Sequence, residues 1–223
     1  MRVILIGLGG IGSNLAEPLA QLMSFAKSER GTNRLVLIDG DRFELKNRNR
    51  QKFDEIGNKA EVTAKRLRDL FPDLDIQAKP HFVDADNLYL FVKEGDVVLL
   101  CVDNHATRKV VNEHLATLKN ALLISGGNEI YDGNVQVYLR RDGLDASPSL
   151  FYRHPEIEFP KDKNPAEPGC EEAIDQGVIQ LLPVNRIISD MMLNAYFLWL
   201  ELGTVRYREV FFDLRTGNTR AVL

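Results

Sequence analysis

The sequence predicts an α/β fold: a mostly parallel sheet with helices on both faces, extended by antiparallel strands towards the C-terminus. Two observations predict the parallel part. Short apolar runs, typical of strands buried on both faces, recur along the chain, and they alternate with segments of helical periodicity. A third observation predicts the extension, because after residue 126 the strand-like segments alternate polar and apolar residues.

The first 125 residues contain the expected βαβ series. Residues 2–6 (RVILI) form an apolar run that ends at a glycine, and a helix is expected from there to about residue 27. Pro18 should kink this helix or end its first part, because proline lacks an N–H and clashes with the preceding turn. The remaining strands are expected at 34–38, 76–80, 96–102 and 121–125, and the helices at 59–71 and 105–119.

The C-terminal part is expected to add antiparallel strands. Residues 134–140 alternate like a strand exposed on one side, and residues 208–214 and 218–223 flank a Thr-Gly turn as in a hairpin. A long apolar helix is expected at 178–202. The segment at about 142–177 is rich in Pro, Gly and charge and has no periodicity, so we expect a crossover loop within one domain that spans residues 1–223.

Composition and charge bear on the expected partners, location and metal content of the protein. A net charge of −4 gives no electrostatic reason to expect nucleic acid or an anionic membrane as a partner. No apolar segment approaches the roughly 20 residues that span a bilayer, and no signal-peptide pattern precedes the first strand. We therefore expect a cytoplasmic protein. Two cysteines cannot form a disulfide framework or a four-thiolate zinc site, and no structural metal is expected.

The first expected βα turn carries a glycine-rich motif. Gly7, Gly9, Gly10 and Gly12 fit G-x-G-x-x-G directly after a strand and before a helix. Glycines permit a tight turn and a close backbone approach, so amides at the helix start can bind phosphate oxygens. The context predicts a Rossmann-like site for a dinucleotide or for ATP. In either case Asp39, at the end of the second strand, would bind ribose hydroxyls.

The stretch DGDRFELKNRNRQKF, at residues 39–53, favours ATP. It places several cations just past the second strand, where a dehydrogenase needs one acidic residue. Adenylyl transfer does need cations, because the charges of the triphosphate must be held and neutralised while pyrophosphate leaves. Arg50, Lys59 and Asp103 are candidates of the right type, with Asp103 as the carboxylate for Mg²⁺.

These residues resemble the HesA/MoeB/ThiF superfamily of adenylating enzymes, which includes the ubiquitin-activating enzymes. The resemblance rests on four motifs that cover about the first 130 residues: GLGGIGS at 7–13, DGDRFELKNRNRQ at 39–51, K-x-E at 59–61 and CVDNHATRKVVN at 101–112. It implies ATP-dependent adenylation of a carboxylate, commonly that of the C-terminal glycine of a ubiquitin-like protein. Pyrophosphate is released, and the acyl-adenylate awaits a sulfur nucleophile.

The resemblance also implies roles for individual side chains. Asp39 would contact the ribose, Arg50 would contact phosphate, Lys59 would neutralise phosphate charge, and Asp103 would hold Mg²⁺ or the reacting phosphate end. The further candidate contacts around the nucleotide are Asp41, Asn47 and Gln51. Asp41 has two interpretations of equal weight: a contact with the nucleotide, or a solvated turn residue.

Several of these residues also have simpler interpretations. Lys59 lies in the first turn of a helix, which is a poor position for a cation, and we interpret it as a sign of bound phosphate. Arg48 is expected to face solvent or to pair with Glu44. Arg108 either pairs with Asp103 or assists the site, and both interpretations stay open.

Cys170, in PAEPGCEEAID, lies in the expected crossover loop. Family members that transfer their substrate onto themselves carry the reacting cysteine in a comparable connection, and a thiolate could attack an acyl-adenylate. Three neighbouring carboxylates argue against this role, because negative charge raises a thiol pKa. Cys101 lies in a buried strand and is expected in the core.

The implied partner is a ubiquitin-like or sulfur-carrier protein, with the chain in a homodimer or a paired complex; modified nucleosides in transfer RNA stay open as acceptors. Two departures from the family are visible. The C-x-x-C pairs that hold zinc in many members are absent, and no arginine-bearing helix precedes the first strand. Two other functions remain as alternatives: a non-catalytic nucleotide-binding subunit, and an NAD-dependent oxidoreductase that would leave the cations unexplained.

Overall fold

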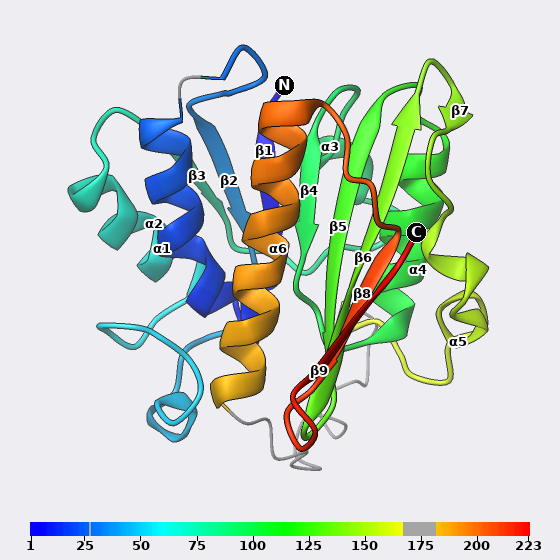
Figure 1. Ribbon diagram of the computed structural model, residues 1–223. Coiled ribbons are helices and arrows are strands. Elements are labelled where there is room, and N and C mark those ends of the chain that lie inside the picture. Colours follow the sequence, from blue (N-terminus) through cyan, green and yellow to red (C-terminus); the bar gives the residue numbers. More distant parts are fainter. Residues whose placement is uncertain (27, 167–181) are drawn as a thin grey trace.

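The computed structural model describes residues 1–26, 28–166 and 182–223. Within this part the strands form one sheet in the order β3-β2-β1-β4-β5-β6-β8-β9, with β7 paired to β6 beside that path (Figure 1). The parallel strands are β1 (Val3–Ile6), β2 (Arg34–Ile38), β3 (Asp75–Lys79), β4 (Val97–Leu100) and β5 (Ala121–Asn128). The antiparallel strands are β6 (Asp132–Arg141), β7 (Leu144–Asp145), β8 (Glu209–Asp213) and β9 (Asn218–Val222). The predicted fold class is confirmed.

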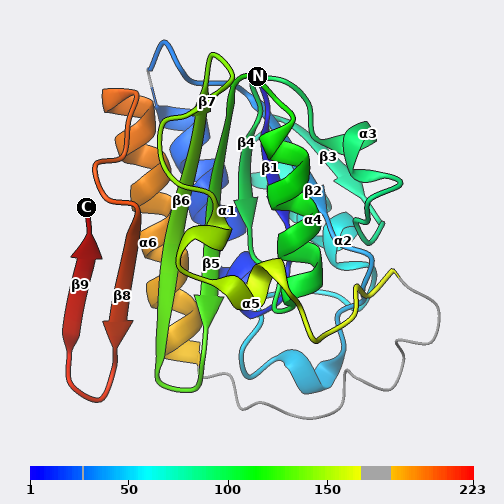
Figure 2. The same ribbon diagram turned by 90° about the vertical axis from the view of Figure 1, so that its right-hand side faces the viewer.

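Helices cover both faces of the sheet. On one face lie α1 (Gly10–Phe25), α2 (Lys59–Leu70) and α6 (Leu182–Leu202). On the other lie α3 (Leu88–Phe91), α4 (His105–Ala116), α5 (Pro155–Glu158) and the 3-10 turn η2 (Leu150–Tyr152). Figures 1 and 2 show α1 and α6 on one side of the sheet and α4 on the other.

Strand β1 shows why the parallel strands are apolar throughout. All four of its residues are buried. Val3 and Leu5 belong to the core on the α1 side, whereas Ile4 and Ile6 belong to the core on the α4 side. Because successive side chains of a strand point to opposite faces, a strand covered on both faces must be apolar at every position.

Two features of the observed helices bear on the expectations. Helix α1 continues through Pro18 to Phe25, so of the two expected effects of Pro18 the ending of the helix is excluded and the kink stays a prediction. The short helix α3 was not expected, because four residues are too few to show a helical period.

The crossover region is partly structured. Its described part contains β7, η2 and α5, so the expectation of a structureless loop is wrong there. These elements are two to four residues long and fall below the length at which periodicity is visible. Residue 170 and the expected helix start at 178–181 lie outside the described residues.

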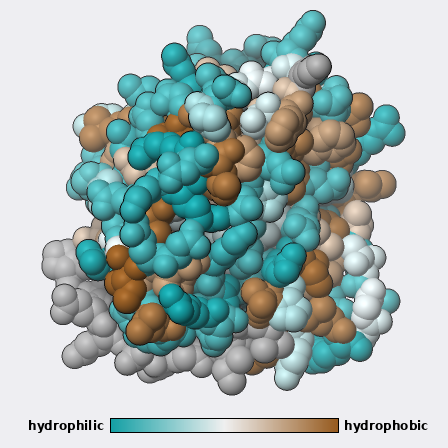
Figure 3. Space-filling view, turned by 90° about the vertical axis from the view of Figure 1, so that its left-hand side faces the viewer, coloured by the Kyte–Doolittle hydropathy of each residue, from teal (hydrophilic) through white to brown (hydrophobic). Residues whose placement is uncertain are grey.

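Among the described residues, no helix is both long and apolar enough to cross a membrane. The face seen from the left of Figure 1 is mostly hydrophilic, and its hydrophobic side chains form separate small patches (Figure 3). Scattered apolar side chains of this kind are normal on a protein surface. The visible part of this face therefore gives no reason to place a docking site there.

Candidate nucleotide site

The register of the parallel strands brings three predicted segments to one edge of the sheet. Ile6 pairs with Ile38 of β2 and with Leu100 of β4, so all three strands end at the same level. The Gly7 amide then donates to the Ile38 carbonyl (2.9 Å), and the Cys101 amide donates to the Ile6 carbonyl (2.8 Å). The glycine-rich turn, the segment after β2 and the segment after β4 therefore leave the sheet side by side.

The glycines of the turn serve different purposes. Gly7 has φ +86°, and a Cβ there would lie 2.9 Å from the backbone of Cys101. A Cβ at Gly12 would lie 1.9 Å from the Gly7 carbonyl oxygen. Gly9, in contrast, has no atom within 4 Å of its Cβ position, and it caps α1 without a side-chain hydrogen bond. The turn thus leaves open space at a helix N-terminus, which fits a bound phosphate.

Asp39 is fixed beside this turn. The Leu8 amide donates to Asp39 Oδ2 (2.6 Å), and the Asp41 amide donates to Asp39 Oδ1 (2.8 Å). Burial raises the pKa of Asp39, whereas Lys59 and the two amides act in the opposite direction. The carboxylate therefore joins the glycine turn to the segment after β2, where the sequence predicts the ribose contact.

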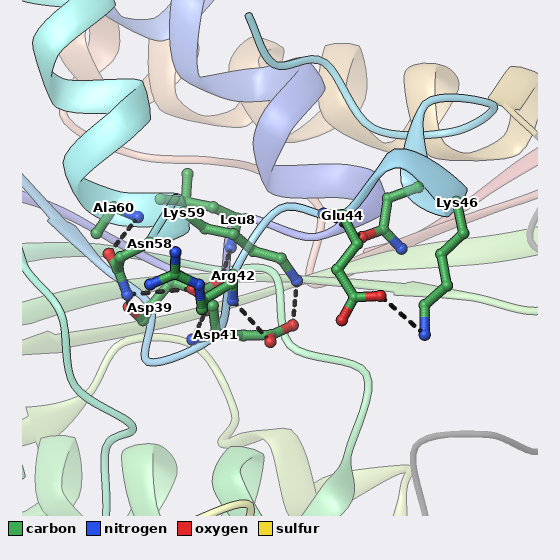
Figure 4. A network of polar contacts seen from close by, with 10 residues as sticks. Leu8, Asp39, Asp41, Arg42, Glu44, Lys46, Asn58, Lys59 and Ala60 are labelled. Carbon is green, nitrogen blue, oxygen red and sulfur yellow. Dashed lines mark hydrogen bonds and ion pairs between the residues drawn. The ribbon is translucent and has the colours of Figure 1, made fainter. Parts of the chain in front are cut away.

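Lys59 is the first residue of α2 and is only 7% exposed. Its Nζ lies 2.5 Å from Asp41 Oδ2, and Figure 4 shows this ion pair next to Asp39. A cation at the positive end of a helix is unfavourable, and a carboxylate at ion-pair distance offsets that cost. Asp41 thus has a structural role as the partner of Lys59.

Asn58 holds this arrangement together and was missed in the sequence. Its Oδ1 accepts hydrogen bonds from the Ala60 and Glu61 amides and caps α2, while its Nδ2 donates to the carbonyls of Asp39 and Asp41 (Figure 4). A signal was present, because Asn directly before a helix with Glu at its third position is a capping pattern.

The loop with the remaining phosphate candidates docks on α1. Asn47, at the end of the 3-10 turn η1 (Leu45–Asn47), is buried, and its carbonyl accepts from the amides of Arg50 and Gln51. The carbonyl of Arg50 accepts from Asn14 Nδ2 (3.3 Å) in the first turns of α1. The backbone of the predicted phosphate-binding loop therefore lies against the helix that follows the glycine turn. Gln51 is also buried, and its Oε1 has no hydrogen-bond partner among the described residues.

Arg48 is exposed, which agrees with one of its two expected placements. Its guanidinium lies over the ring of Phe53, 5.6 Å from the centroid, while Glu44 pairs with Lys46 instead (3.0 Å). The expected pairing of Arg48 with Glu44 is therefore wrong. The reason is local: the 3-10 turn brings Lys46 to Glu44, and an aromatic ring offers the arginine a cation–π contact.

Asp103 follows β4 at the same edge. It is exposed, and its carboxylate makes no hydrogen bond or ion pair with any described residue. Arg108 does not pair with it directly. The buried Arg108 guanidinium donates to Ser125 Oγ (2.8 Å) and to the carbonyls of Val102 and Gly126 (2.6 and 2.7 Å). Burial lowers the pKa of Arg108, and Asp103 opposes this from a longer distance.

The N-terminus of α4 lies directly beyond Asp103 and is capped by a distant residue. Asp162 accepts hydrogen bonds from the amides of His105 (2.7 Å) and Ala106 (2.9 Å). Two residues later, Asn164 donates to the Val83 carbonyl (2.9 Å). No sequence signal could have shown these contacts, because they join residues more than 55 positions apart.

A groove of about 570 Å³ opens from this edge towards the antiparallel strands. It begins at Asp103 and reaches the hairpin of β8 and β9. Residues along it include Asp103, Asn128, Asn134, His154, Phe211 and Arg220. Arg108 reaches the same groove, and among the described residues no group of three or more His, Cys, Asp or Glu could hold a metal ion.

The comparisons with known proteins support the motif analysis. The ThiF family model matches residues 1–211. The chain belongs to the ThiF family. It is 32% identical over 186 residues to a sulfur carrier protein adenylyltransferase of Thermus thermophilus, which covers 81% of this chain and 63% of that protein. It is 35% identical over 126 residues to the sulfur carrier protein ThiS adenylyltransferase of Escherichia coli, which covers 55% of this chain and 47% of that protein.

Solved structures of the same fold are also similar. Escherichia coli MccB matches over 99% of this chain and 61% of its own, with a TM-score of 0.75 and 16% identity. A structure of MccB with ATP matches with a TM-score of 0.74 and 17% identity, over 99% and 62% of the two chains. At this identity the likeness shows the fold alone. The chain spans less than two thirds of the length of these relatives.

Proposed function

We propose that this ThiF family chain is an ATP-dependent adenylyltransferase. Its substrate would be a carboxylate, that of the C-terminal glycine of a ubiquitin-like or sulfur-carrier protein. The observation that carries the proposal is that the open glycine turn, Asp39, Lys59 and Asp103 share one edge of the sheet with the mouth of a groove. The names of the two adenylyltransferase relatives support the same activity.

The proposed nucleotide site uses backbone and side-chain donors together. Amides at the start of α1 would bind phosphate oxygens, and Asp39 would accept hydrogen bonds from the ribose hydroxyls. Arg50 and Lys59, with Asn47 and Gln51 beside them, would hold the phosphates. Charge-assisted hydrogen bonds of this kind contribute about 1.5–3 kcal/mol each.

The proposed reaction forms one bond and breaks another. A carboxylate oxygen of the carrier attacks the α-phosphorus of ATP, the bond from this phosphorus to the oxygen leading to the β-phosphate breaks, and its electron pair leaves with pyrophosphate. The attacking group is already ionised, so no base is required. Arg50 and Lys59 stabilise the charge of the departing pyrophosphate.

Asp103 fits a magnesium ligand, because its carboxylate is exposed and makes no ion pair with a described residue. Bound Mg²⁺ would neutralise charge on the phosphate oxygens. The groove that starts at Asp103 would take the extended tail of the carrier, with its terminal glycine at the mouth. The proposal also includes a cytoplasmic location and a homodimer or paired complex.

Transfer of the activated carboxylate to Cys170 is a separate hypothesis. This residue lies outside the described residues, and the glutamates beside it disfavour a reactive thiolate. Mass spectrometry after addition of ATP and carrier would show a thioester between Cys170 and the carrier, formed as AMP leaves the acyl-adenylate, if transfer occurs. An unmodified thiol alongside released acyl-adenylate would contradict the hypothesis.

Pyrophosphate exchange tests the proposed activity. Wild-type protein with a carrier ending in Gly-Gly should exchange labelled pyrophosphate into ATP, and Arg50→Ala and Asp103→Asn should each lower the rate about 10- to 100-fold. Arg48→Ala is the matched control on the same loop, since Arg48 stacks on Phe53, and it should keep the wild-type rate. Nucleotide binding without exchange would instead favour the non-catalytic subunit.

A further inference from the structure

The wall of the groove contains a histidine held between two carboxylates. His154 lies just before α5, and its Nε2 is 2.7 Å from Glu209 Oε1 on β8. Its Nδ1 is 2.7 Å from Glu156 Oε1 within α5. The ring also stacks on Phe211 of β8, at 6.5 Å between centroids. One side chain thus connects the α5 segment to the C-terminal hairpin.

This geometry fits the imidazolium form. A neutral imidazole carries one N–H, and its other nitrogen is an acceptor. Both ring nitrogens of His154 face carboxylate oxygens, which accept but do not donate when ionised. The hydrogen bond to Glu209 raises the pKa of His154, burial opposes this, and the hydrogen bond to Glu156 adds to the rise.

The charges around Glu209 make its contact with His154 important for the structure. Glu209 has a side chain only 3% exposed, and its Oε1 also accepts from Asn134 Nδ2 of β6 (2.6 Å). Arg153 Nε lies 3.8 Å from Glu209 Oε2, and its side chain is 46% exposed. From α4, His105 acts on Glu156 electrostatically. The nearest cation to the buried carboxylate is therefore His154, at 2.7 Å, and it faces the groove beside Asn134.

We propose that protonated His154 is a positioning residue for the carrier tail, because it ties the α5 wall of the groove to β8 and to the Asn134 side of its floor. This inference rests on the proposed function of the groove. When His154 loses a proton, one of its two carboxylate contacts must be lost, and Glu209 is left buried with a weaker partner. The tail should then bind less well while the nucleotide site is unchanged.

The same group links stability to pH. The pKa of His154 is raised in the folded protein above its unfolded value of about 6.5. Its contribution to folding is therefore fully present below about pH 6.5 and is lost as the pH rises through the folded pKa. His154→Gln should be less stable than wild type at pH 6 in urea denaturation, and the difference should shrink at higher pH.

Nitrogen-15 NMR of the histidine rings in the full chain tests the protonation directly. The His154 signals are assigned by their loss in His154→Gln. The titration midpoint of the His154 ring should lie above 6.5, and both ring nitrogens should carry protons below that midpoint. In Glu156→Gln the midpoint should move down, because one of the two carboxylates is removed. A midpoint at or below 6.5 would overturn the inference.

Pyrophosphate exchange between pH 6 and 9 tests the consequence for the carrier. In wild type the KM for the carrier should rise about tenfold as His154 deprotonates. The values of kcat and of the KM for ATP should follow the same pH profile in wild type and in the variants. His154→Gln should show the high carrier KM at every pH, and Glu156→Gln should show the rise at lower pH. Identical carrier KM profiles in wild type and Glu156→Gln would contradict the role of His154. Absence of exchange in wild type at every pH would instead contradict the proposed function and leave the NMR result as the separate test.

Discussion

At the scale of single residues, Lys59 shows that one sequence observation can have two physical causes. Its position in the first turn of α2 was interpreted as evidence of phosphate, because a cation is unfavourable there. The structure gives another cause, because the ion pair with Asp41 places a negative charge beside the ammonium at the helix start. The phosphate role of Lys59 is therefore a proposal that needs its own test.

A pair of substitutions separates the two roles of Lys59. Lys59→Met should weaken Mg-ATP binding about 10- to 100-fold in calorimetry if the ammonium contacts phosphate. Asp41→Asn should keep or increase the affinity, because Lys59 loses a competing anion. Unchanged affinity in Lys59→Met would show that the lysine only pairs with Asp41. A fall in Asp41→Asn would show that this carboxylate itself contacts the nucleotide.

At the scale of elements, helix α4 depends on a contact with the segment beyond α5. The carboxylate of Asp162 binds the amides of His105 and Ala106, where negative charge complements the helix dipole. Asn104 adds an ordinary cap by accepting from the Thr107 amide (2.7 Å). The helix next to Asp103 is thus fixed by a residue from the crossover region.

Asp162→Ala should therefore lower the free energy of unfolding by about 1 kcal/mol. Asp162→Asn is the matched variant: it keeps one acceptor oxygen and loses the charge, so its loss should be smaller. Urea denaturation near neutral pH measures both. An equal stability of Asp162→Ala and wild type would show that the cap contributes nothing, and its contact with α4 would then be incidental.

The elements that could be predicted are those long enough to show a clear pattern of apolar residues. The buried runs of β1, β2 and β4 and the helices α2 and α4 follow from alternation and apolar content. Pro18 does not end α1, because the apolar side of this helix packs against the sheet and α6. Packing of this kind overrides local propensity, and the sequence contains no sign of it.

At the scale of the whole molecule, the parallel half was predictable and the groove was not. Strand order in a βαβ series follows general rules, so the meeting of residues 7, 39 and 103 at one edge could be inferred. The groove instead depends on contacts such as that of His154 with Glu209, which are 55 positions apart and join the antiparallel strands to α5. Such pairings have no local signature.

A ligand that binds only the folded chain must stabilise the whole molecule. At a hundredfold excess over Kd, Mg-ATP should add about 2.7 kcal/mol, which corresponds to a rise in Tm of roughly 5–10 °C for a domain of this size. The same concentration of NAD⁺ should have a clearly smaller effect. A larger shift with NAD⁺ than with Mg-ATP in a thermal unfolding assay would revive the oxidoreductase alternative.

Arg108 has a mechanical consequence for this architecture. Its planar guanidinium fastens the carbonyl of Val102, next to Asp103, to Ser125 and Gly126 at the end of β5 that leads into the groove. Within the described residues, these hydrogen bonds tie the segment after β4 to the end of β5 through one rigid side chain. The distance between Asp103 and the adjoining wall of the groove is therefore set when the chain folds.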